Sequence, residues 1–85
     1  MTTFETITSV IERVTGIPAA SITPATTFVD VSADSLDHVE IFLEVEREFD
    51  DIDLDQDALD LVGTFGQLAD LVDRAIADRA QARAA

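Results

Sequence analysis

The chain has 85 residues, enough for one small domain with a single modest core and too few for two. Its 18 acidic residues against five arginines give a formal net charge of −13, which excludes nucleic acids and anionic membranes as expected partners and favours a basic protein surface. Cysteine is absent, which excludes disulfides, thiolate nucleophiles and sulfur-ligated metal sites.

Residues 3–15 are predicted to form the first helix. Thr2 and Glu5 have the spacing of a capping box, in which side chains satisfy backbone N–H groups that the helix leaves unpaired. Apolar residues then recur at helical spacing until Gly16 and Pro18, a pair typical of a helix end.

The next segment, residues 16–33, keeps no long helical period and mixes prolines, threonines and serines with apolar residues. We predict a long but ordered loop, because its apolar side chains can attach it to the core. These anchors are Ile17, Ile22, Phe28 and Val29.

A second helix is predicted to begin with Asp34 as its N-cap, Ser35 at the first helical position and Asp37 in the first turn. Steps of about 100° per residue divide its apolar side chains into two groups. The core-facing group consists of Ile41, Phe42, Val45 and Phe49. The other group consists of Leu36, Val39 and Leu43, bordered by Asp37, Glu40, Glu44 and Glu46. This second strip is more apolar surface than the core of a small bundle needs.

A short third helix is predicted over residues 56–61, and a last helix follows the capping-box pair Thr64 and Gln67. The alanine-rich end, residues 79–85, is expected to be a frayed or disordered tail, so that residues 1–78 form the folded domain. The predicted fold is an all-α four-helix bundle of three longer helices and one short third helix, with a long loop between the first two.

The beginning of the chain lacks the basic start and apolar core of a signal peptide, and no apolar run approaches membrane-spanning length. We therefore expect a cytoplasmic protein with no membrane insertion.

Catalysis by Ser35 would require a base, and the only histidine, His38, lies three residues further on. A hydrolase is disfavoured, because the sequence has neither the G-x-S-x-G turn that exposes a nucleophile nor an evident oxyanion hole. His38 is expected to be partly buried and hydrogen-bonded to the preceding loop, with a role in tuning motion around the serine as the alternative. Taken alone, Asp34 and Ser35 are typical of a plain helix start.

Aspartates at positions 51, 53, 55 and 57 match the first four ligand positions of a calcium loop. The match then fails, since Gln56 stands where glycine is needed and Val62 where a glutamate should complete the shell. We expect diffuse, weak binding of divalent cations, or simply a solvated acidic face. A calcium-binding acidic module remains a distant alternative.

The run FVDVSADSLDHVEIFLEVEREFDDIDL resembles the acyl carrier protein family, whose motif is D-S-L at the head of the second helix. The residues in register are Asp30, Val31, Ala33, Asp34, Ser35, Leu36, Asp37, Val39, Glu40, Glu46 and Phe49. Residues 64–72 also resemble the family's fourth helix, and the resemblance extends from residue 2 to about residue 78.

The resemblance implies that Ser35, with Asp34 beside it, is the cofactor site. In the family, a phosphopantetheinyl transferase moves 4′-phosphopantetheine from coenzyme A onto the serine, and the thiol of this arm carries an acyl chain as a thioester. The protein would then have no catalytic residue, no metal site and no enzymatic activity of its own. Its expected role is to shuttle intermediates of fatty acid or related lipid or polyketide biosynthesis.

The resemblance also implies a docking surface on the second helix for the transferase and for acyltransferases, ketosynthases and other acyl-processing enzymes. The matching positions are Leu36, Asp37, Glu40, Leu43 and Glu46. The protein is expected to be a monomer whose apolar interior, lined by residues such as Val29 and Leu54, could admit the acyl chain.

Two residues depart from the family pattern. Ser32 stands where glycine is usual, and Arg47 stands where an acid is common. These departures keep open a pathway-specific polyketide, lipopeptide or peptidyl carrier, and outside the carriers a structural interaction subunit.

Overall fold

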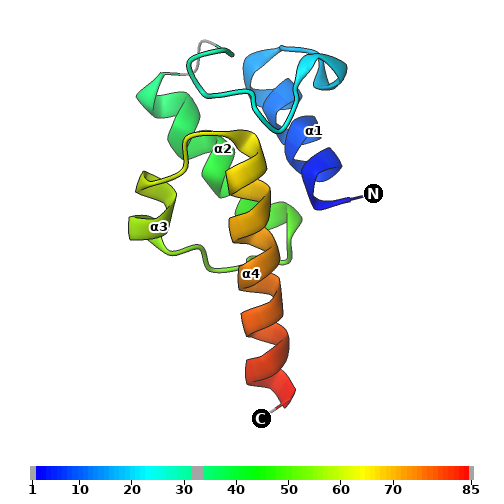
Figure 1. Ribbon diagram of the computed structural model, residues 1–85, viewed down its shortest axis with the longest axis vertical. Coiled ribbons are helices and arrows are strands. Elements are labelled where there is room, and N and C mark those ends of the chain that lie inside the picture. The colour runs from blue at the N-terminus through cyan, green and yellow to red at the C-terminus, as the bar shows by residue number, and fades with distance from the viewer. Residues whose placement is uncertain (1, 32–33, 85) are drawn as a thin grey trace.

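The structure, a computed structural model, describes residues 2–31 and 34–84 and is built from helices (Figure 1). The described elements are α1 (Thr3–Thr15), the short 3-10 helix η1 (Ala19–Ser21), α2 (Ser35–Glu48), α3 (Gln56–Asp60) and α4 (Phe65–Ala84). The predicted all-α bundle of three longer helices and a short third helix is confirmed. In the described part of the chain, no helix combines the length and the apolar character that a membrane span requires.

The helix ends follow local chemistry. The Glu5 N–H donates to Thr2 Oγ1 at 3.1 Å at the start of α1, and Gly16 ends that helix with a φ of 81°. The start of α4 is a reciprocal pair, because the Gln67 N–H donates to Thr64 Oγ1 and the Thr64 N–H donates to Gln67 Oε1. The predicted caps of both helices are therefore confirmed.

The last helix, α4, is continuous to Ala84 and extends beyond the rest of the bundle (Figure 1). Its Arg79 donates to the backbone oxygen of Asp50, at the end of α2, with an N–O distance of 3.0 Å. This contact attaches the projecting part of α4 to the bundle. Fraying of residues 79–85 concerns motion, and it stays a prediction.

The core lies where α1 packs against α2 and α4. Its fully buried side chains are aliphatic except for one phenylalanine: Ile7, Val10, Ile11, Ile41, Val45, Phe65, Leu68 and Val72. The two predicted core residues of α2 with the deepest positions, Ile41 and Val45, are among them, and Phe42 and Phe49 pack against the same cluster half-buried.

The loop between α1 and α2 is attached to the core mainly by Phe28. Its ring lies 4.7 Å from the ring of Phe65 in α4 and 5.6 Å from that of Phe42 in α2, between centroids. Ile22 is also buried and Ile17 packs against the core, so these three predicted anchors are confirmed.

Val29 is not an anchor, and the prediction for this residue is wrong, because 84% of it is exposed. The Asp30 N–H donates to the Thr27 oxygen at 3.1 Å, which makes Phe28 and Val29 the central residues of a tight turn. Phe28 faces the core while its neighbour faces solvent. Val31, 5% exposed, is the second buried residue of this segment.

Candidate functional site

Ser35 is exposed at the first position of α2. Asp34 precedes it as the N-cap, with Oδ1 accepting from the Asp37 N–H at 2.9 Å, and Asp37 Oδ2 accepts from the Asp34 N–H at 3.2 Å. This predicted helix start is confirmed, and it is a full capping box. It fixes the backbone on both sides of the serine and leaves the hydroxyl toward solvent.

His38 lies one turn below Ser35 but is directed to the loop. It is half-buried, and its ring lies 4.3 Å from that of Phe28, between centroids. Neither residue hydrogen-bonds to the other, although both belong to the described part of the chain. The geometry thus gives Ser35 no paired base, and the described contact of His38 with the loop is aromatic packing, which helps to hold the segment before α2.

Three apolar residues on the outer side of α2 are exposed to an unusual extent. Leu36 is 79% exposed, Val39 56% and Leu43 48%. We call these three residues, with Glu40 between them, the α2 strip. A helix of a small monomer usually buries its large aliphatic side chains, so an exposed row of this kind is typical of a surface that meets another molecule. The strip begins next to Ser35.

The acids predicted beside the strip are bound in different ways. Asp37 is part of the capping box, and Glu46 Oε2 accepts from the Leu54 N–H, in the segment before α3, at 3.3 Å. Glu40 is exposed and takes part in no hydrogen bond or ion pair within residues 2–31 and 34–82. Its carboxylate is the one most available to a partner.

The path from α2 to α3 is a feature that the sequence analysis missed. Asp50 and Asp51 both adopt left-handed backbone conformations, with φ values of 59° and 58°. Such conformations are uncommon outside glycine but are best tolerated by Asp and Asn, so the pair Asp50-Asp51 was the available signal. The turn brings Ile52 and Leu54 back over α2, where the Ile52 N–H donates to the Glu46 oxygen at 3.2 Å.

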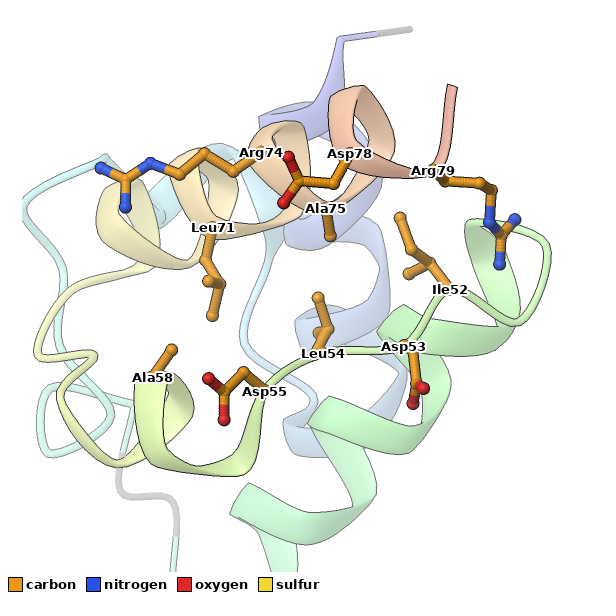
Figure 2. A pocket seen from close by; sticks show the side chains of 10 residues that line it. All are labelled: Ile52, Asp53, Leu54, Asp55, Ala58, Leu71, Arg74, Ala75, Asp78 and Arg79. Atoms are coloured by element: carbon orange, nitrogen blue, oxygen red, sulfur yellow. The ribbon is translucent and has the colours of Figure 1, made fainter. Parts of the chain in front are cut away.

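A cavity of about 450 Å³ lies between this returning segment, α3 and α4 (Figure 2). Leu54, Ala58 and Leu71 point toward one another across it, while Arg74 and Arg79 extend away on opposite sides. Leu54 was expected in the apolar interior and is 8% exposed. None of the predicted site residues lines this cavity.

The acidic segment before α3 offers no cage for a metal ion. Within the described residues, no group of three or more His, Asp or Glu side chains is placed to hold one. One of the four calcium-loop aspartates, Asp55, instead caps α3 by accepting from the Asp57 N–H at 3.0 Å. A helix cap of this kind directs the carboxylate to backbone rather than to a shared centre.

Two comparisons with known proteins agree with this arrangement. The family model described as "Phosphopantetheine attachment site" matches residues 5–72, which include α1, α2, α3 and the first part of α4. An acyl carrier protein of Picosynechococcus sp. is 34% identical over 70 residues, covering 81% of this chain and 85% of the relative. An acyl carrier protein of Amoebophilus asiaticus is 33% identical over 70 residues, covering 82% of this chain and 86% of the relative.

Proposed function

This chain belongs to the acyl carrier protein family and contains its phosphopantetheine attachment domain, and from that premise we propose that Ser35 is the residue that bears the arm. The observation that carries the proposal is the position of Ser35, an exposed hydroxyl at the head of α2 and beside an exposed apolar strip. The thiol needed for a thioester comes with the cofactor, which accounts for a carrier without cysteine.

The position of Ser35 suits the modification. A transferase would join the serine oxygen to the phosphorus that carries pantetheine in coenzyme A, while the pyrophosphate bond breaks and adenosine bisphosphate leaves. The hydroxyl proton passes to a base of the transferase, because His38 packs on Phe28 rather than on Ser35. The new phosphodiester then lies at a helix N-terminus, where backbone N–H groups and the helix dipole favour negative charge.

We propose that the α2 strip and its acids form the docking surface for the transferase and for acyl-processing enzymes. Leu36 and Leu43 would supply apolar contact area, and Glu40 an unpaired charge. Opposite charges on the partner raise the rate of encounter more than the final affinity. That combination suits a monomeric carrier that has to leave each enzyme soon after it arrives.

The proposed cargo is an acyl chain of fatty acid or related lipid or polyketide biosynthesis. The name "acyl carrier protein" of both relatives supports acyl rather than peptidyl cargo. Mass spectrometry of the carrier isolated from the cells that make it, before and after thioester cleavage by hydroxylamine, identifies the cargo by its mass. An aminoacyl or peptidyl mass would support the peptidyl alternative.

The attachment site is tested by intact-protein mass spectrometry after incubation with coenzyme A, magnesium and a broad-specificity phosphopantetheinyl transferase. We expect one phosphopantetheinyl group on the wild-type chain and none on Ser35→Ala. Ser21→Ala and Ser32→Ala serve as matched controls, because each removes one other serine hydroxyl of the loop. Loss of the modification in Ser32→Ala but not in Ser35→Ala would reassign the site, and no modification of the folded wild-type protein would contradict the function.

A further inference from the structure

Arg47 is a positive charge in an otherwise negative region. No other Lys or Arg occurs between Arg13 and Arg74, and residues 30–60 contain thirteen acids. Its side chain is 68% exposed. A cation in this place changes what kind of surface α2 presents.

Arg47 lies in line with the α2 strip rather than beside it. Leu36, Glu40, Leu43 and Arg47 are separated by four, three and four residues, the spacing of neighbours along one face of an α-helix. Arg47 also borders a hollow of about 200 Å³ together with Leu43, Glu46 and Asp51. Any partner that covers Leu43 therefore comes close to the guanidinium group.

Arg47 also neutralises an acid of the helix. Its Nη1 lies 2.8 Å from Glu44 Oε1. The carboxylate of Glu46 is engaged by the Leu54 N–H on the other side. The negative charge of the strip is consequently concentrated at the Ser35 end, where Glu40 is unpaired, and the far end carries an exposed cation.

We infer that Arg47 is a specificity residue of the docking surface proposed above, and that it favours protein partners which place a carboxylate opposite the far end of the strip. Partners with a uniformly basic surface bind less well, because one of their cations meets the guanidinium group. Like charges at an interface discriminate against wrong partners by several-fold or more, even when they add little affinity to the right one. This inference rests on the proposed function of Ser35 and α2.

The first test measures kcat and KM of a broad-specificity phosphopantetheinyl transferase with a basic carrier-binding surface, using the full-length apo chain as substrate. We expect KM to fall about twofold in Arg47→Gln and about three- to tenfold in Arg47→Glu, with kcat unchanged. Arg74→Glu is the matched control, because it makes the same change in net charge on α4 and should leave KM within about twofold of wild type.

A competing explanation is that Arg47 acts only within the helix, through Glu44 and the dipole at the end of α2. In that case the Arg47 variants melt at lower temperature and their KM stays at the wild-type value, an outcome that overturns the inference. Equal KM shifts in Arg47→Glu and Arg74→Glu would overturn it as well, since net charge alone would then explain the effect.

The second test reverses, one at a time, the charges of the basic surface residues around the transferase active site. At least one reversal should lower KM for the wild-type carrier and raise it for Arg47→Glu, which would identify the position opposite residue 47. The absence of any such inversion of sign would contradict the inference. Intact mass is recorded in every arm, so that a failure to modify Ser35 at all, which would count against the proposed function, is distinguished from modification that is indifferent to residue 47.

Discussion

The carboxylates of α2 differ in how much of their charge remains available to other molecules. Asp34 and Asp37 accept backbone N–H groups of the first turn, and Glu46 accepts the N–H of Leu54. Glu48 and Glu44 are paired with Arg13 and Arg47. A carboxylate that already accepts a hydrogen bond stabilises the fold, whereas an unpaired one such as Glu40 can be replaced without loss of an internal contact.

Removing Glu40 should therefore affect docking without affecting stability. For Glu40→Ala we expect an unchanged or slightly higher melting temperature, since alanine is the best helix former, and a KM of the transferase about two- to fivefold higher. Thermal unfolding followed by circular dichroism and steady-state transfer kinetics measure the two effects. A melting temperature lowered by several degrees would indicate that Glu40 has an internal role.

Glu46→Ala is the matched change that should affect stability. It removes the acceptor of the Leu54 N–H, a loss of about 1 kcal/mol, which corresponds to about 4–8 °C in a domain of this size. Glu46→Gln keeps an oxygen acceptor and should recover most of the loss. If both Glu46 variants melted like wild type, this hydrogen bond would be dispensable in solution.

At the scale of elements, the loop before Ser35 is held in place by the beginning of α4. The Phe65 and Gly66 N–H groups, which have no acceptor within their own helix, donate to the Thr26 and Pro24 oxygens at 3.0 and 2.9 Å. Thr27 and Thr64 form an isolated antiparallel bridge at the same place. The loop thus supplies the caps of α4, and α4 in turn keeps the loop ordered.

Gly66 makes this approach possible. A Cβ atom at this position would lie 2.8 Å from the Pro24 oxygen and 2.9 Å from Pro24 Cβ, so Gly66→Ala must displace the loop backbone. The gain in helix propensity, about 1 kcal/mol, is outweighed by overpacking of about 1–3 kcal/mol. We expect a lower melting temperature by chemical or thermal unfolding.

Gly63→Ala is the control for this substitution, because its added Cβ meets only the flexible end of the Gln67 side chain, at 3.3 Å. It should melt close to wild type. A Gly66→Ala variant as stable as Gly63→Ala would mean that the loop adapts at little cost.

The parts of the elements that could be predicted from sequence are the parts decided within a few residues. Thr2, Asp34 and Thr64 form hydrogen bonds to residues three positions away, so that composition and spacing were sufficient. The fate of Val29 depends on the Thr27–Asp30 turn and on which of two adjacent apolar residues reaches the core. Local hydrophobicity cannot make that choice, because both residues are equally suited to burial.

At the scale of the whole molecule, the candidate site was predictable and the connections around it were not. Ser35, Leu36 and Leu43 belong to one helix, so their common orientation follows from the helical period. The contacts of Glu46 with Leu54 and of Arg79 with Asp50 instead require the reversed path after α2. That path depends on two left-handed residues and on the placement of α4, which only the assembled fold determines.

The whole molecule also has to fold against its own charge. The formal net charge is −13, and residues 2–31 and 34–82 contain two ion pairs, Arg13–Glu48 and Arg47–Glu44, both with exposed or half-exposed partners. Exposed pairs of this kind contribute little, about 0–1 kcal/mol each, so most of the repulsion among acids remains uncompensated. Compaction brings these acids closer together than they are in the unfolded chain, and repulsion therefore destabilises the folded state.

Salt should therefore stabilise this protein. Raising sodium chloride from about 0.01 M to about 0.15 M shortens the Debye length from about 30 Å to about 8 Å, less than half the length of the 41 Å long molecule. We expect a gain of about 1 kcal/mol, or about 4–8 °C in melting temperature, measured by circular dichroism at constant pH. Magnesium chloride at equal ionic strength should do at least as well, because divalent ions gather near clustered carboxylates, whereas sucrose at the same osmolality controls for effects unrelated to charge. A melting temperature that falls as sodium chloride is added would mean that attraction between opposite charges outweighs repulsion in the folded state, despite the excess of acids.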